Sequence, residues 1–168
     1  MEIIVNTIQK QNLVSAIDKT IDYLKGDYGT YDWNDSCKCN VGVLVQHLLD
    51  LNESDFYSLR RGYIPTWDNL HKIWLTGLEK DEKCLIKNIL DTGVSLKDLA
   101  DLEVLSNPKV LSRTTFETQG THFKDKQNLI SYLNAWAKIL EEEINDGASL
   151  DKGIKTVRTE QLTELVAA

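Results

Sequence analysis

The chain has 168 residues, of which 42% are hydrophobic and 27% are charged, a balance typical of a globular protein rather than a disordered one. Its 26 Asp and Glu residues outnumber its 19 Lys and Arg residues, which gives a net charge of −7. Non-specific nucleic-acid binding depends on neutralising phosphates, and this net charge works against it. We therefore predict one domain that has no nucleic-acid partner.

The three cysteines, Cys37, Cys39 and Cys84, are an odd number at irregular spacing, which is not a disulfide framework. We therefore expect reduced thiols and a cytoplasmic protein. The first residues have neither the basic start nor the apolar run of a signal peptide, so none is expected. The densest apolar stretch, residues 41–51, is far too short to cross a bilayer, and we predict no membrane contact.

The sequence predicts a mainly α-helical protein, a single compact multi-helix domain. Few prolines and many Leu, Ile, Lys and Glu residues favour this fold class. The first helix is expected to start near Thr7 or Asn12 and to stop before Gly26. Apolar residues at a spacing of three and four define its buried face: Leu13, Ile17, Ile21 and Leu24.

A polar, aromatic-rich loop is predicted at residues 27–39. Asn40 is a good N-cap residue and predicts that the next helix covers residues 40–51. Almost every direction around this helix is apolar, which is typical of a helix at the centre of a fold. We expect a long helix near the C-terminus to pack against it.

Shorter helices are expected at residues 54–60, 66–76 and 80–92. Gly93 is placed to cap the third of these at its C-terminal end. Ser95 begins a capping box, in which Asp stands where Glu or Gln is usual, and so predicts another short helix.

Residues 105–124 are the least helical part of the chain. Their β-prone residues predict at most a small β-hairpin around residues 110–123, and an irregular crossover fits the same pattern.

Asp125 is expected to cap the longest helix, over residues 125–146, and Gly147 to close it. We expect Trp136, which lies in the apolar stripe of this helix, to be a core residue. On this basis residues 1–147 form the helical domain, and residues 148–168 form a C-terminal extension that is docked or frayed.

Two thiols lie directly before the predicted central helix, in the sequence Cys37-Lys38-Cys39. The dipole and the free N–H groups at a helix N-terminus favour the thiolate, which is the reactive form, and Lys38 adds a positive charge. The chain could therefore be a thiol-dependent enzyme or redox protein that uses Cys37 or Cys39. The alternative is that the thiols pack in the core as small apolar groups.

A catalytic thiol needs an imidazole within hydrogen-bond reach, and His122, in a non-helical stretch, is the candidate base. No known catalytic-cysteine signature surrounds Cys37 or Cys39. These two cysteines could also supply half of a zinc site, but the usual second pair of ligands is absent from the sequence. We therefore predict no bound metal and no cofactor.

The loop before the thiols combines carboxylates with aromatic side chains, a composition found at interface hot spots. An acidic domain can neutralise a basic protein partner through such a loop. The alternative is an ordered loop in which Trp33 folds into the core and the aspartates face water. The candidate partner-binding residues are Asp27, Tyr28, Tyr31, Asp32, Trp33 and Asp35.

These observations favour a non-enzymatic protein-interaction domain, with the thiol-dependent enzyme or redox protein as the alternative. Nothing in the sequence defines the oligomeric state or the identity of the partner.

Overall fold

The computed structural model describes residues 2–59 and 80–167. Within these ranges the chain forms α1 (Glu2–Lys25), α2 (Asn40–Leu48), α3 (Glu53–Leu59), α5 (Lys80–Asp91), α6 (Leu96–Val104), α7 (Pro108–Leu111), the 3-10 turn η1 (His122–Lys124) and α8 (Lys126–Ala167). No residue in the two ranges is in a strand, so the predicted mainly helical fold is confirmed. In place of a hairpin around residues 110–123, the chain makes an irregular crossover.

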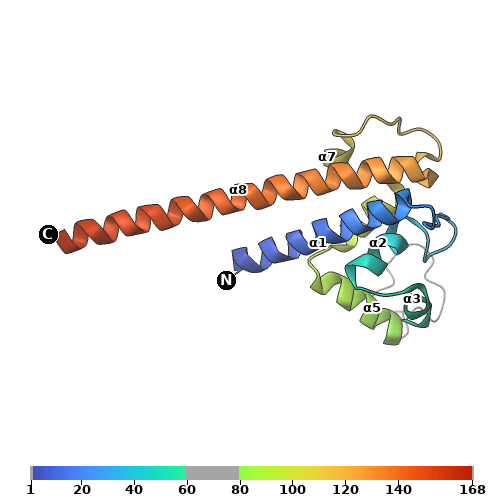
Figure 1. Ribbon diagram of the computed structural model, residues 1–168, viewed down its shortest axis with the longest axis horizontal. Coiled ribbons are helices and arrows are strands. Elements are labelled where there is room, and N and C mark those ends of the chain that lie inside the picture. The colour runs from blue at the N-terminus through green and yellow to red at the C-terminus, as the bar shows by residue number, and fades with distance from the viewer. Residues whose placement is uncertain (1, 60–79, 168) are drawn as a thin grey trace.

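The first and last helices form the long axis of the molecule. Figure 1 shows α1 and α8 running antiparallel and side by side, with α2 on another side of α1. We expected the C-terminal helix to pack against the helix that begins at residue 40. That expectation is wrong, because its principal neighbour is α1, and α1 separates much of it from α2.

The predicted central position of α2 is confirmed for its first two turns. Every residue from Asn40 to Val45 is buried, and Leu44 and Val45 have no exposed surface. The helix ends at Leu48 rather than at residue 51, and Asp50 has a left-handed backbone with φ of 54°. Such a backbone cannot continue a right-handed helix.

Most of the predicted helix caps are confirmed. Ser95 and Asp98 form the predicted capping box at the start of α6, and Asp125 Oδ1 accepts the Asn128 N–H at the start of α8. Gly93, with φ of 91°, follows α5 as expected. The cap of α2 is different, because Cys39 rather than Asn40 is the N-cap residue, and its sulfur accepts the Gly42 N–H at 3.4 Å.

The longest helix does not close at Gly147, as we expected. Instead α8 continues to Ala167, so residues 148–167 are helical. One glycine costs a helix only about 1 kcal/mol relative to Ala, which neighbouring good helix formers offset. The division of the chain at residue 147 stays a prediction, and the helix expected at 66–76 lies outside the described residues.

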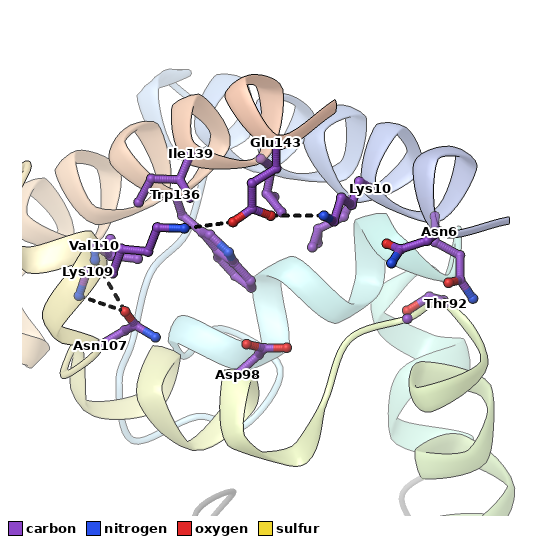
Figure 2. A pocket seen from close by; sticks show the side chains of 14 residues that line it. Asn6, Lys10, Thr92, Asp98, Asn107, Lys109, Val110, Trp136, Ile139 and Glu143 are labelled. Atoms are coloured by element: carbon purple, nitrogen blue, oxygen red, sulfur yellow. Dashed lines mark hydrogen bonds and ion pairs between the residues drawn. The ribbon is translucent and has the colours of Figure 1, made fainter. Parts of the chain in front are cut away.

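Trp136 was expected in the core. It is only half-buried and lies at the edge of a cavity between α1 and α8 (Figure 2). The rest of its stripe is more deeply placed, and Leu129 and Leu133 have no exposed surface. Among the described residues, no helix is both long enough and apolar enough to cross a bilayer.

Gly42 allows the preceding loop to cross directly over α2. A Cβ atom at this position would lie 2.0 Å from the Ser36 carbonyl oxygen and 2.9 Å from the Cys37 carbonyl carbon. Both are backbone atoms, so no side-chain rotation relieves the clash.

We predict that Gly42→Ala lowers the free energy of unfolding by roughly 3 kcal/mol or more, since loop or helix must move. Gly147→Ala is the matched control. A Cβ there meets no atom within 4 Å, so this change should raise the free energy of unfolding by about 0.5–1 kcal/mol through helix propensity. Urea denaturation of both variants measures the two effects, and a neutral Gly42→Ala would contradict the crossing.

Candidate functional site

The predicted interaction loop is residues 27–39, and aromatic side chains anchor it to the fold. The Tyr31 hydroxyl donates a hydrogen bond to Asn40 Oδ1 at 2.7 Å. Trp33 Nε1 donates to the Glu103 carbonyl oxygen at 3.3 Å, and its ring lies 5.3 Å from that of Phe123. These contacts hold the middle of the loop against the end of α6 and against η1.

The buried amide of Asn40 is the centre of this arrangement. Its Nδ2 lies 3.2 Å from the Leu102 carbonyl oxygen and 2.9 Å from those of Glu103 and Phe123. An amide nitrogen has two hydrogens, so three acceptors share them. Burial, together with nearby negative groups, raises the pKa of Tyr31 well above its usual value. The Tyr31 phenol therefore keeps its proton and donates to Asn40.

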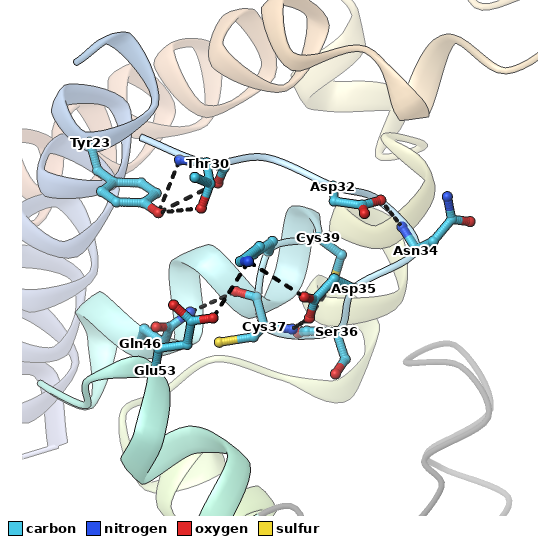
Figure 3. Close-up of polar contacts among 11 residues, drawn as sticks. Tyr23, Thr30, Asp32, Asn34, Asp35, Ser36, Cys37, Cys39, Gln46 and Glu53 are labelled. Atoms are coloured by element: carbon cyan, nitrogen blue, oxygen red, sulfur yellow. Dashed lines mark hydrogen bonds and ion pairs between the residues drawn. The ribbon is translucent and has the colours of Figure 1, made fainter. Parts of the chain in front are cut away.

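Short polar turns shape the rest of the loop. The Thr30 N–H donates to the Tyr23 hydroxyl at 3.1 Å, which fixes the start of the loop to α1. Asp32 Oδ1 accepts the Asn34 N–H at 2.9 Å, and Asp35 Oδ1 accepts the Cys37 N–H at 3.0 Å. Figure 3 shows these side chains folded back onto their own loop. Asp32 and Asp35 therefore have a structural role as turn formers.

The six predicted contact residues divide into two groups. Tyr31, Trp33 and Asp35 are half-buried and engaged with the fold, whereas Asp27 and Asp32 are exposed. Tyr28 is 95% exposed, which is unusual for an aromatic residue in an ordered loop. The loop thus presents one free aromatic side chain and two carboxylates to solvent.

The two thiols at the start of α2 are buried. Cys37 is 1% exposed and Cys39 is 6% exposed, and neither forms a disulfide. Burial raises the pKa of Cys37 to about 12, and the carboxylates of Glu53 and Asp35 add to this effect. Lys38 opposes it, as the sequence suggested, but is outweighed. Its ammonium group lies 3.5 Å from Glu53 and 3.8 Å from Asp35, which neutralise it.

The structure does not bring His122 together with either thiol. His122 Nε2 lies 3.4 Å from the Leu105 carbonyl oxygen, and the buried Nδ1 atom has no hydrogen-bond partner. The ring lies between the aromatic rings of Phe116 and Phe123, at 6.0 and 5.6 Å. The hydrogen bond that a Cys–His pair requires is therefore not formed.

Metal-binding side chains are also dispersed. In the part of the chain that the structure describes, no three His, Cys, Asp or Glu side chains are grouped so that they could hold a metal ion. His47 is engaged elsewhere, since its Nδ1 lies 2.8 Å from the Val43 carbonyl oxygen and 3.0 Å from the Thr20 hydroxyl.

Comparison of the chain with protein-family models, curated proteins and solved structures found no match.

Two residues that organise the loop were missed by the sequence interpretation. Its sequence position predicts Asn40 as a helix cap, whereas its side chain joins three segments. Gly42 was not singled out, although a glycine near the start of an apolar helix can mark a close backbone approach.

We predict that Asn40→Ala lowers the free energy of unfolding by about 2–3 kcal/mol, because it removes a buried side chain that bonds the loop, α6 and η1 together. The bonds that remain, from Tyr31 to the Phe123 carbonyl oxygen at 3.4 Å and from Trp33 to α6, replace only part of this network. Asn134→Ala is the matched control. That side chain is exposed on α8 and donates only to the Ile130 carbonyl oxygen, so the change should be within about 0.5 kcal/mol. Equal effects of the two substitutions in urea denaturation would contradict the central role of Asn40.

Burial of the thiols predicts slow alkylation. In the native protein at pH 8, iodoacetamide should label Cys37 and Cys39 at least about 100-fold more slowly than in urea, since labelling requires local opening. Mass spectrometry of peptides from timed samples measures the rates. Rapid native labelling at either position would instead support a reactive thiol.

The raised pKa of Cys37 also predicts a pH dependence of stability. Above pH 9 the unfolded chain releases this thiol proton while the folded protein keeps it until about pH 12. The free energy of unfolding should therefore fall as the pH rises through this window. Tyr31 and Tyr132, whose pKa values burial also raises, add to the fall above pH 10. Cys37→Ala should flatten the slope in urea titrations from pH 8 to 11, and an unchanged slope would contradict the assignment.

Proposed function

We propose that this protein is a non-enzymatic interaction domain that binds a basic protein segment through residues 27–39. The observation that carries the proposal is the 95% exposure of Tyr28 in a loop that Tyr31 and Trp33 anchor to the fold. Tyrosine is enriched at interface hot spots because it offers a large contact area with few rotatable bonds.

The anchoring favours binding because it reduces the entropy that is lost on association. A loop held by side-chain hydrogen bonds at Tyr23, Tyr31 and Trp33 is already ordered before a partner arrives. Asp27 precedes Tyr28 directly and Asp32 follows it in the same loop, and both are exposed. The net charge of −7 adds long-range attraction for a basic partner.

The thiol-dependent alternative has less support. Both thiols are buried, the pKa of Cys37 is raised rather than lowered, and His122 makes its hydrogen bond elsewhere. Buried cysteines that form no disulfide suit a reducing compartment, and we infer that the protein works in the cytoplasm.

The proposal is tested by photo-crosslinking. A photoreactive phenylalanine analogue replaces Tyr28 in cells, and the matched control carries it at Asn134, which is exposed on α8. A protein with a Lys- or Arg-rich segment should be crosslinked from position 28 and not from position 134. The absence of any crosslink specific to position 28 would overturn the proposal.

With that partner, Tyr28→Ala should weaken binding by at least about tenfold, the typical effect of a hot-spot residue. Asp27→Asn with Asp32→Asn should slow association and reduce its salt dependence. Asn keeps the acceptor oxygen that the Asn34 N–H requires, so this pair isolates the charge. The charge-matched control is Asp146→Asn with Glu141→Gln, both exposed on α8. It should change neither the association rate nor its salt dependence. Stopped-flow measurements at several salt concentrations provide the readout.

A further inference from the structure

A cavity of about 260 Å³ lies between α1, the turn that follows α5, the first turn of α6, α7 and α8 (Figure 2). Its apolar wall includes Leu13 of α1, Val110 of α7 and the half-buried Trp136 of α8. The volume exceeds the roughly 150 Å³ of a cavity that holds benzene and falls just below the range of sites for drug-sized ligands, which begins near 300 Å³. It suits a molecule with one aromatic ring.

An ion-pair cluster stands at the edge of this cavity. Glu143 of α8 forms two ion pairs. Its Oε2 lies 3.0 Å from Lys10 Nζ of α1, and its Oε1 lies 2.7 Å from Lys109 Nζ of α7. Figure 2 shows the carboxylate of Glu143 between the two ammonium groups, with the Trp136 ring beside it. Two cations thus converge on one carboxylate, and one positive charge is left over within the cluster.

Asp98 and Asn107, two other polar residues of the lining, already have hydrogen-bond partners. Asp98 Oδ2 accepts the Ser95 N–H and hydroxyl, both at 2.8 Å. Asn107 Oδ1 accepts backbone N–H groups at the start of α7, and its Nδ2 donates to Asp101 at 3.0 Å. The two lysines are the cations of the lining, and each ammonium group has three hydrogens, so the pair can donate to an anionic ligand.

We propose that this cavity binds a small aromatic carboxylate, whose ring packs against Trp136 and whose carboxylate takes the place of Glu143 between Lys10 and Lys109. The hydrogen bonds from Lys109 and Lys10 lower the pKa of Glu143, so it is a carboxylate at neutral pH and mimics the ligand group. Glu143 is one-third exposed, and its side chain can turn to water when a ligand enters. The lining also includes the Asp98 carboxylate, so its two lysines and two carboxylates balance, and a ligand anion is favoured because it takes over both lysines when Glu143 turns away.

The probes are phenylacetate, the neutral 2-phenylethanol and the cationic 2-phenylethylamine, titrated into the full chain by calorimetry and ligand-observed NMR. Phenylacetate should bind saturably and at least about tenfold more tightly than the alcohol, and the amine should bind most weakly, since only the anion can replace Glu143. No saturable binding of phenylacetate, or equal binding of the anion and the alcohol, would overturn the proposal.

Glu143→Gln removes the internal competitor and should tighten phenylacetate binding severalfold, with little effect on 2-phenylethanol. Lys109→Met should remove most of the preference for the anion, and its 61% exposed side chain tolerates the change. Lys97→Met is the matched control, because Lys97 is an exposed lysine that pairs with Asp101 and does not line the cavity. Thermal unfolding establishes that each variant is folded. Unchanged phenylacetate affinity in both folded Glu143→Gln and folded Lys109→Met would also overturn the proposal.

Discussion

The buried amide of Asn40 holds together three segments that are far apart in the sequence: the 27–39 loop, the end of α6 and η1. Its position as the first residue of α2 matters, because α2 is buried against α1 and cannot shift easily. A buried polar group destabilises the fold unless it is hydrogen-bonded, and only a few arrangements of its neighbours supply those hydrogen bonds. Asn40 therefore sets where the loop and η1 lie, and the exposed part of the loop inherits that order.

The sequence predicted best those features that depend on neighbouring residues. The Ser95 capping box, the glycine after α5 and the Asp125 cap each need only a few consecutive residues to form. The same holds for the buried stripes of α1 and α8. Features that depend on distant segments were not predictable in this way. The link from Asn40 to Glu103 spans 63 positions, and no local pattern encodes it.

The thiols show how burial can outweigh a local electrostatic argument. A cysteine at a helix N-terminus with a lysine beside it has two reasons to ionise. However, the same helix is the buried centre of the fold. Desolvation destabilises a thiolate there by more than the helix dipole stabilises it. Lys38 is moreover paired with Asp35 and Glu53. The sequence placed Cys37 and Cys39 correctly at the start of a buried helix, and for Cys37 that burial raises the pKa where the local argument lowered it.

The two proposed binding regions lie toward opposite ends of α1. The loop follows directly from its C-terminal end, whereas Asn6, Gln9 and Lys10 line the cavity near its N-terminal half. The side chains of α1 interdigitate with those of α2 and α8, so a displacement at one end of α1 moves the whole helix. The Lys10–Glu143 ion pair is one of the contacts that fix α1 to α8. A carboxylate ligand that replaces Glu143 would loosen this link and so act on α1. A second connection runs through α6, in which Asp98 lines the cavity and the Glu103 carbonyl oxygen accepts the Trp33 N–H of the loop.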